Sequence, residues 1–467
     1  MKHCKKLAAI ASVLLVLGFT ACSSDGDGGS SSNDSTQAGI PATSKPSGTT
    51  PKTPASTATT TTGPTGTTGA TGITTNGTPT TNRTPSANGL VKPTYKTVYN
   101  VTEDTYIDKI DEIIAKLAAN DPSQPKEFEF KFSGTKPITF EQWNNNARVP
   151  DNKMSELFKA PHADVHVGLD FSSAKVDKAF IERGSMFLTH NFESIVLPQK
   201  IDVDWELGNY YFQDCRCLKY IKFPDNLKKV GEYITFCSNN VNPGSLEFEI
   251  PNTIKSLNNY AFCASRHLKK IVFNEGLEEI GEYAFMSCIK LVNVNLPSTL
   301  KTIKYKAFSD CSELKNISLN NGLEKIGENA FDNCTSLETI ELPSSILSIG
   351  DAAFENTKLK KVIIPESVDT IGSKIFWNCN DLEVVEIRAP KIGTDVLAGT
   401  NVKSLVIGEK VKEIGTGNFV STLTSVVFKN PEGWKCDGVP VDAAILKDLA
   451  DAATYLKTNK DKVFTRQ

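Results

Sequence analysis

The middle of the chain reads Leu268-x-x-Ile271-x-Phe273, then Leu277-x-x-Ile280-Gly281, then Ala284-Phe285-x-x-Cys288. The same order of residues returns from Leu291, Leu314 and Leu337, at a spacing of 23 residues. A repeat period of about 20 to 50 residues is typical of a solenoid, in which each repeat packs on its neighbours. A solenoid presents a long regular surface rather than an enclosed pocket, which favours binding over catalysis.

Each repeat contains the alternation of a short β-strand. In Val294-Asn295-Leu296 and Ile317-Ser318-Leu319, apolar residues flank one variable residue, which must point away from the core. Prolines follow several of these strands, because a missing N–H ends the hydrogen-bond ladder: Pro224, Pro251, Pro297, Pro343 and Pro365. Glycines follow the next apolar pair, where we expect turns with positive φ: Gly231, Gly281, Gly327, Gly350, Gly372 and Gly415. Ala-Phe pairs then supply a small residue for close approach and a ring for the core.

Less regular copies extend the array from about Phe192 to about Phe428. We predict an α/β solenoid with short strands on its concave face, a small α+β N-terminal cap and a C-terminal helix, preceded by a disordered tether. The expected divisions are a leader (1–21), the tether (22–94), the N-terminal cap (95–190), the repeats (191–430) and a C-terminal cap (431–467).

The first residues have the layout of a secretory signal. Lys2, Lys5 and Lys6 precede the apolar run from Leu7 to Phe19, which is short for a membrane-spanning helix. Phe19-Thr20-Ala21-Cys22 resembles the bacterial lipobox, with Phe19 where Leu is more usual, so we expect lipidation of Cys22. More than one acyl chain there would anchor the protein stably. A plain cleaved signal is the alternative.

Residues 23 to about 92 are nearly all Ser, Thr, Gly, Pro, Asn and Ala, which cannot bury enough apolar surface to offset the entropy of ordering. Such a tether has an average span of roughly 45 Å. Beyond it, helical spacing predicts a helix over residues 103–119, and alternation predicts strands at Phe128 to Phe132 and Val165 to Leu169. The stretch from Phe140 to Phe158 reads as partly helical. His162 and His166 lie too far apart on a strand, about 13 Å, to share a metal ion.

The recurrence of Leu-x-x-Ile-x-Leu-Pro, Ile-Gly and Ala-Phe-x-x-Cys in one order resembles the BspA-type leucine-rich repeats of bacterial surface lipoproteins, especially those of treponemes and related anaerobes. Similar proteins carry a lipobox, a polar tail and a C-terminal Gly-Trp followed by a helix and a basic end. Here the Gly-Trp is Gly433-Trp434, the helix is expected from Val441 to Lys457, and the basic end is Arg466. The repeats near Leu246 and Leu382 depart from the pattern, which leaves their strand register open.

Cysteines occupy one phase of the repeat at Cys215, Cys288, Cys311, Cys334 and Cys379, with Thr357 in the intervening copy. Residues on successive strands lie about 4.8 Å apart, slightly long for the Cβ separation of a disulfide. A buried ladder of free thiols is the favoured interpretation. Occasional disulfides and a metal site are the alternatives, and Cys215 with Cys217 is the first pair to test.

The net charge of -3 and sequence pI of about 6.1 give no basic footprint for a nucleic acid. The chain has no phosphate loop, His-Glu-x-x-His zinc helix or Gly-x-Ser-x-Gly elbow. We therefore predict a protein without catalytic activity, cofactor or metal.

Strand residues that point away from the core form the candidate binding face. They are Tyr220, Lys222, Lys270, Val272, Asn293, Asn295, Asn316, Ser318, Thr339, Glu341, Lys361 and Ile363. Variable residues on a rigid scaffold favour a protein partner, and solvated positions without a partner are the equal alternative. The resemblance implies a surface adhesin that is lipid-anchored in the outer membrane and engages host matrix or bacterial proteins. A periplasm-facing envelope scaffold is the other hypothesis.

Overall fold

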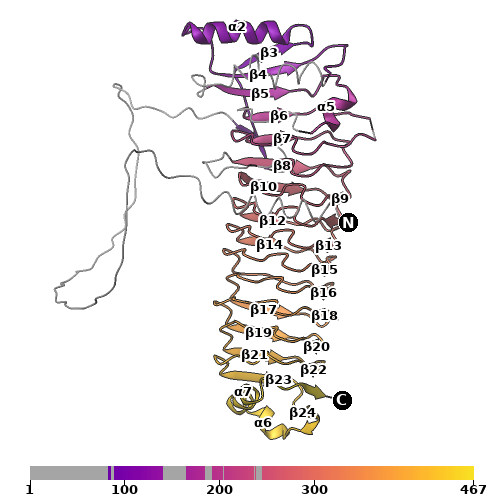
Figure 1. Ribbon diagram of the computed structural model, residues 1–467, viewed down its shortest axis with the longest axis vertical. Coiled ribbons are helices and arrows are strands. Elements are labelled where there is room, and N and C mark those ends of the chain that lie inside the picture. The colour runs from indigo at the N-terminus through magenta and orange to yellow at the C-terminus, as the bar shows by residue number, and fades with distance from the viewer. Residues whose placement is uncertain are drawn as a thin grey trace, which may run out of the picture. The chain divides into compact units, whose positions relative to one another are not determined.

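The computed structural model describes residues 83–85, 89–139, 165–184, 192–202, 204–235, 237 and 245–466. All of them belong to the second of two units into which the chain divides, Asn76–Gln467. This unit is a straight column of stacked turns. Most turns contribute a longer strand to one side, and many contribute a two-residue strand to another (Figure 1). The predicted solenoid fold is confirmed.

The longer strands form three successive parallel sheets along the column. The first has seven strands in the order β10-β8-β7-β6-β5-β4-β3. Strand β5, which precedes the expected boundary at residue 190, pairs with β6, which follows it. The expected N-terminal cap and the repeats therefore share one sheet. Its strands are β3 Thr97–Val101, β4 Glu127–Phe132, β5 His166–Asp170, β6 Ser194–Val196, β7 Tyr220–Lys222, β8 Leu246–Ile250 and β10 Leu268–Phe273. The others are β12 Asn293–Asn295 with β14 Asn316–Ser318, and β17 Lys361–Ile364, β19 Val384–Ile387, β21 Ser404–Ile407 and β23 Ser425–Phe428.

The second side carries a ladder of parallel two-residue strands. They are β9 Ser256–Leu257, β11 Glu279–Ile280, β13 Thr302–Ile303, β15 Lys325–Ile326, β16 Ser348–Ile349 and β18 Thr370–Ile371, followed by β20 Lys391–Ile392 and β22 Glu413–Ile414. In each, the second residue is buried. From β9 to β18 it lies beside the equivalent residue of the next turn, as Ile303 does beside Ile326. The two ladders and the turns between them enclose one continuous core.

Aromatic rings form the axis of that core. Phe262, Phe285, Phe308, Phe331 and Phe354 stack face to face, with ring centroids 5.2–5.6 Å apart and interplanar angles of at most 11°. The Ala before each ring is fully buried, which confirms the predicted use of the Ala-Phe pair. Burial of each ring contributes about 1.5–3 kcal/mol of transfer free energy before packing is counted.

The repeat glycines do not have the expected positive φ. A Cβ at Gly350 would instead lie 2.3 Å from the backbone N of Glu328 in the preceding turn, and one at Gly281 would lie 2.5 Å from the carbonyl O of Leu257. Glycine is required there because two turns approach closely. The positive φ falls two residues later, at Tyr283 (58°) and Ala352 (51°), and again at Ser287 (60°) and Asn356 (57°).

Both ends of the array carry helices. At the first end α2, Tyr106–Ala118, is the helix predicted over 103–119, and it buries Tyr106, Ile110 and Ile113. At the other end α6, Ala443–Lys447, and α7, Leu449–Thr458, pack against β23. The short helix α5, Lys178–Glu182, lies in an early turn. The predicted partly helical stretch from Phe140 to Phe158, and His162, lie outside the described residues.

The last strands close the end of the array. Strand β26, Phe464–Arg466, pairs antiparallel with β22 and with β24, Trp434–Cys436, which in turn pairs with β25, Val439–Pro440. The Arg466 guanidinium lies 5.7 Å from the centre of the buried Trp434 ring. Antiparallel strands across the edge stop further parallel pairing, as a terminal cap requires. Within the described part of the chain, no helix is long and apolar enough to cross a membrane.

Candidate binding surface

Alternation along the longer strands turns one set of side chains outward, and we call these outward side chains the strand face. Within β12 and β14, Val294 and Ile317 are buried while their neighbours on both sides are exposed. The strands pair in register, so Asn293 lies beside Asn316 and Asn295 beside Ser318. The amide of Asn316 donates a hydrogen bond to Oδ1 of Asn293 over 2.8 Å.

All twelve candidate residues are partly or fully exposed, and each has a buried residue on at least one side, so their side chains point away from the core. Ten of them lie in strands, whereas Thr339 and Glu341 flank the buried Ile340 in a stretch without regular strand pairing. The structure also gives the strand register of the two irregular repeats near Leu246 and Leu382, and there too the outward residues lie side by side. Register pairs Glu247 with Lys270, and Glu386 with Ile363.

The strand face also includes residues that the sequence pattern left out. They are Glu129, Gly168, Asp170, Ser194 and Val196 in the first strands, Glu247 and Glu249 in β8, and Val384, Glu386, Ser404, Val406, Ser425 and Val427 in the last three strands. Glu129, Gly168 and Asp170 precede the predicted array, so no repeat spacing pointed to them. Alternation within Ser404–Ile407 and Ser425–Phe428 is enough to find the last ones.

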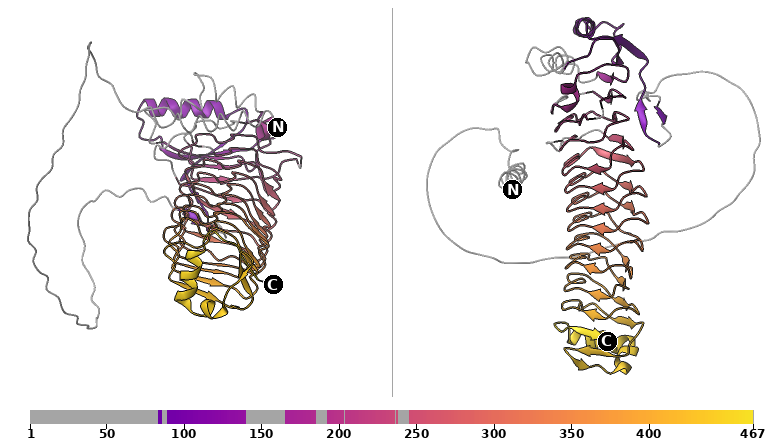
Figure 2. Two further views of the ribbon diagram at one scale, coloured as in Figure 1. Left: turned by 60° about the horizontal axis from the view of Figure 1, so that its bottom comes forward. Right: turned by 90° about the vertical axis from the view of Figure 1, so that its right-hand side faces the viewer.

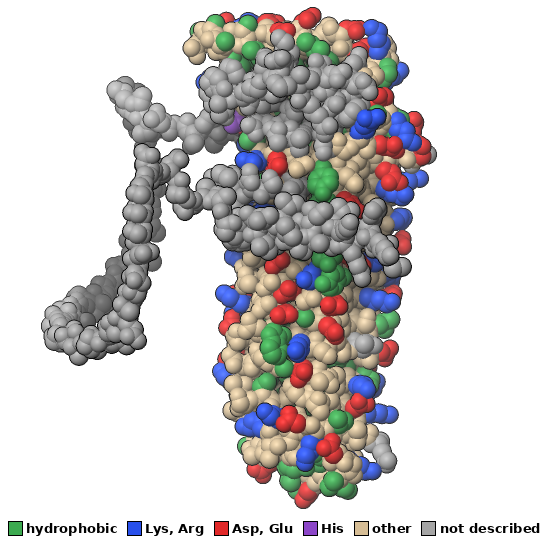
Figure 3. All heavy atoms as spheres, viewed as in Figure 1, with side chains coloured by type: hydrophobic (Ala, Val, Ile, Leu, Met, Phe, Trp, Pro, Cys, Tyr) green, Lys and Arg blue, Asp and Glu red, His purple; other side chains and the backbone are tan. Residues whose placement is uncertain are grey.

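Charge on the column is mixed rather than gathered by sign. On the side shown in Figure 3, basic and acidic side chains are interspersed along the described part of the column. Ion pairs join successive turns, as between Lys304 and Glu279 at 2.7 Å and between Lys290 and Glu313 at 3.0 Å. Such a surface fits another protein better than a polyanion.

The first part of the strand face is covered by the chain itself. The predicted tether extends to residue 94, but its last residues are packed on the fold. Leu90 is only 2% exposed, and β2, Val91–Pro93, lies against β7. The Nζ of Lys270 donates a hydrogen bond to the carbonyl O of Gly89 over 2.8 Å. Strand β2 pairs with β1, Arg83–Pro85, as a short hairpin beside the column (Figure 2).

The cysteine ladder consists of free thiols at Cys288, Cys311, Cys334 and Cys379, all buried. Each Sγ donates to the carbonyl of a Phe in the preceding turn, as Cys311 does to Phe285 over 3.2 Å. Burial raises the pKa of these thiols, so they remain protonated and unreactive at neutral pH. The ladder is structural, and the favoured interpretation of the cysteine phase is confirmed for these four.

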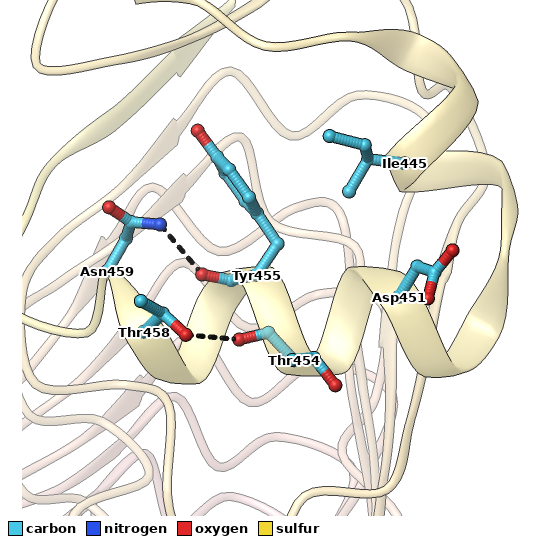
Figure 4. A pocket seen from close by; sticks show the side chains of 6 residues that line it. All are labelled: Ile445, Asp451, Thr454, Tyr455, Thr458 and Asn459. Carbon is cyan, nitrogen blue, oxygen red and sulfur yellow. Dashed lines mark hydrogen bonds between the residues drawn. The ribbon is translucent and has the colours of Figure 1, made fainter.

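One hollow lies away from the strand face, beside α6 and α7 (Figure 4). It has a volume of about 380 Å³ and is lined by Ile445, Asp451, Thr454, Tyr455, Thr458 and Asn459. The hydroxyl of Thr458 and the amide of Asn459 are bonded to helix carbonyls, each over 2.9 Å. Asp451 is the one carboxylic acid in this lining, and Tyr455 supplies a phenol whose pKa is raised by burial. Among the described residues no group of three or more His, Cys, Asp or Glu side chains could hold a metal ion.

Comparison with known proteins gives one family match. Six copies of the "BspA type Leucine rich repeat region" match residues 181–315, 242–334 and 303–425, which together span more than half of the 467 residues. No curated protein sequence is significantly similar.

Solved structures with similar folds come from bacteria. A leucine-rich cell surface protein from Faecalibacterium prausnitzii is 20% identical over 53% of this chain and 74% of its own, with a TM-score of 0.37. A leucine-rich repeat protein from Bacteroides ovatus is 25% identical over 51% and 73%, with a TM-score of 0.36. A T. pallidum leucine-rich repeat protein is 26% identical over 40% and 77%, with a TM-score of 0.29.

Proposed function

Because the chain belongs to the BspA-type leucine-rich repeat family, we propose that it is a protein-binding module of the bacterial cell surface, without catalytic activity. The observation that carries the proposal is the strand face from β12 to β23. Asn293, Asn316 and Lys361 are exposed there on strands whose inward residues are fixed by the core. A rigid strip whose exposed residues vary from turn to turn is how solenoids present specificity.

We further propose that the protein is an adhesin that engages host matrix or bacterial surface proteins. Lipidation of Cys22 would hold it at the outer membrane, and the polar residues after Cys22 would extend it from that surface. Mixed charge on the column and the absence of a basic sequence footprint support a protein partner over a nucleic acid.

The binding face is tested with two matched quadruple variants. The first replaces Asn293, Asn316, Glu341 and Lys361 by Ala on the strand face. The control replaces Ser256, Glu279, Lys325 and Ser348, which point outward from the short-strand ladder. Beads that carry each protein are applied to host matrix proteins and to bacterial cells. We expect at least a tenfold loss of attachment for the first variant only, with unfolding temperatures close to wild type. Equal attachment of both variants would refute the strand-face assignment.

Cell location is tested separately, by adding protease to intact cells that carry a lipid label on Cys22. Removal of the protein with retention of the labelled anchor supports the surface adhesin. Full protection would refute it and favour the periplasm-facing scaffold. An unlabelled protein of mature length would indicate the plain cleaved signal instead.

A further inference from the structure

The first part of the strand face holds an extended segment of the chain across its strands. We call residues 89–95 the strap. Gly89 meets β10 through Lys270, β2 lies against β7, and the Tyr95 hydroxyl lies 3.1 Å from Oγ of Ser194 in β6. The Tyr95 ring also lies over Gly168 in β5. Four strand-to-strand steps of about 4.8 Å from β10 to β5 cover about 19 Å, and six extended residues cover about 20 Å. The strap is therefore extended and nearly perpendicular to the strands.

The strap inserts a cation between two carboxylates. The Lys92 Nζ lies 2.7 Å from Oε1 of Glu129 in β4 and 3.4 Å from Oδ2 of Asp170 in β5. With the strap in place, Glu129 is 9% exposed and Asp170 is 8% exposed, so the cation of Lys92 offsets the cost of burying the two carboxylates. Burial by itself would raise the pKa of Asp170, but hydrogen bonds from Ser172 and the charge of Lys92 outweigh burial and hold that pKa below its ordinary value.

The floor of the same region accommodates an aromatic ring. A Cβ at Gly168 would lie 2.5 Å from Cε2 of Tyr95, so the ring occupies the space that a side chain would fill. In β6, Ser194 lies beside Gly168 and Val196 lies beside Asp170 on the same face of the sheet. Three binding features thus lie in a row across the sheet. They are the two carboxylates, the space above Gly168 for an aromatic ring, and the Lys270 ammonium, which donates to a backbone carbonyl.

We propose that the strand face of β4 to β10 is a binding surface for an extended peptide with one lysine and an aromatic residue three positions later, and that the strap is its exchangeable internal occupant. The partner is another protein's extended segment with this chemistry. The lysine enters between Glu129 and Asp170, and the ring rests on Gly168. A strap linked to the fold by β3 has an effective concentration on the order of millimolar, so it excludes peptides of ordinary affinity until it is displaced.

This proposal is independent of the function proposed for β12 to β23, because the two use different strands. It is tested on the full mature chain with a fluorescent peptide of residues 89–96, Gly-Leu-Val-Lys-Pro-Thr-Tyr-Lys. The chain variant Lys92→Glu places a third carboxylate beside Glu129 and Asp170 and should release the strap. We expect this variant to bind the peptide at least tenfold more tightly than wild type. A peptide with Glu in place of its first Lys should not bind.

The triple variant Lys92→Glu, Glu129→Gln and Asp170→Asn should lose most peptide binding, because the acid pair is neutralised. Hydrogen exchange of the unaltered protein provides the second measurement. The amides of residues 90–95 other than Pro93 should exchange at least tenfold faster than the amide of Phe130 in β4, since the strap opens without unfolding of the sheet. Equal protection of the strap and Phe130, or a folded Lys92→Glu chain that does not bind the peptide, would overturn the proposal.

Discussion

The hydroxyl oxygen of Thr357 lies 3.1 Å from the sulfur of Cys379 in the next turn. Thr357 occupies the ladder position that Cys334 holds one turn earlier, and its hydroxyl donates 2.9 Å to the carbonyl of Phe354. At this repeat position, a hydroxyl in Thr357 and a thiol in Cys334 therefore both donate hydrogen bonds to backbone carbonyls. The cysteine phase reflects this need for a small buried donor, and it requires neither oxidation nor a metal.

Thiol reactivity should therefore divide sharply in the native protein. Cys217 is exposed, so we expect it to react with Ellman's reagent before the buried thiols, even though partial burial raises its pKa. Cys288, Cys311, Cys334 and Cys379 should react only after unfolding, because burial raises their pKa and blocks access. The measurement is a time course in buffer and in guanidinium, with Cys217→Ser as the control that removes the fast phase. Labelling of any of these four cysteines in the native protein, located by peptide mass mapping, would show that the ladder is accessible.

Opposite substitutions two residues apart should have opposite effects. Gly350→Ala places a Cβ 2.3 Å from the backbone N of Glu328, so we expect the free energy of unfolding to fall by about 1–3 kcal/mol. Ala352 has a φ of 51°, and Ala352→Gly should raise stability by about 0.5–1 kcal/mol because glycine adopts this region without strain. Urea unfolding of both variants checks the pair. Destabilisation by Ala352→Gly would contradict the backbone argument.

The sequence predicted the directions of the strand side chains correctly, but it did not predict why Gly350 must be glycine. Period and alternation identified the buried phases and the outward direction of residues such as Asn293 and Asn316, because both depend on local geometry alone. The role of Gly350 depends on the distance to a neighbouring turn, and a single repeat does not show that distance. The strap was missed for a similar reason, since Lys92 follows a long polar stretch and its partners lie in β4 and β5. The signal that could have found it is the run from Leu90 to Tyr95, where large side chains return before the predicted cap.

Loss of one ring from the aromatic stack should weaken the middle of the array. Phe331 is fully buried between Phe308 and Phe354, with ring centroids 5.6 and 5.5 Å away. We expect Phe331→Ala to lower the free energy of unfolding by about 3–5 kcal/mol through lost burial and the cavity that remains. Leu347→Ala is the control, because Leu347 is 42% exposed and its truncation should cost less than about 0.5 kcal/mol. Similar costs for both variants would mean that the stack does not stabilise the fold.

Acid should destabilise the protein through His267. This residue is fully buried, and neither of its ring nitrogens has a hydrogen-bond partner in the described part of the chain. Burial lowers its pKa from 6.5 to about 4, although the charge of Asp214 opposes the shift. The folded state therefore binds this proton less readily than the unfolded state, so the contribution to stability is full above pH 6.5 and is lost as the pH falls towards 4. With about 1.36 kcal/mol per pKa unit, the total loss is about 3 kcal/mol. Urea unfolding at pH 7, 6 and 5 should show this decline in the wild-type protein, while His267→Met should show a shallower one because it has no group to protonate. If the free energies of unfolding of the two proteins fell in parallel, other residues would cause the acid sensitivity. The pKa of His267 would then be similar in the folded and unfolded states, which would require a hydrogen-bond partner for the protonated ring in the folded protein.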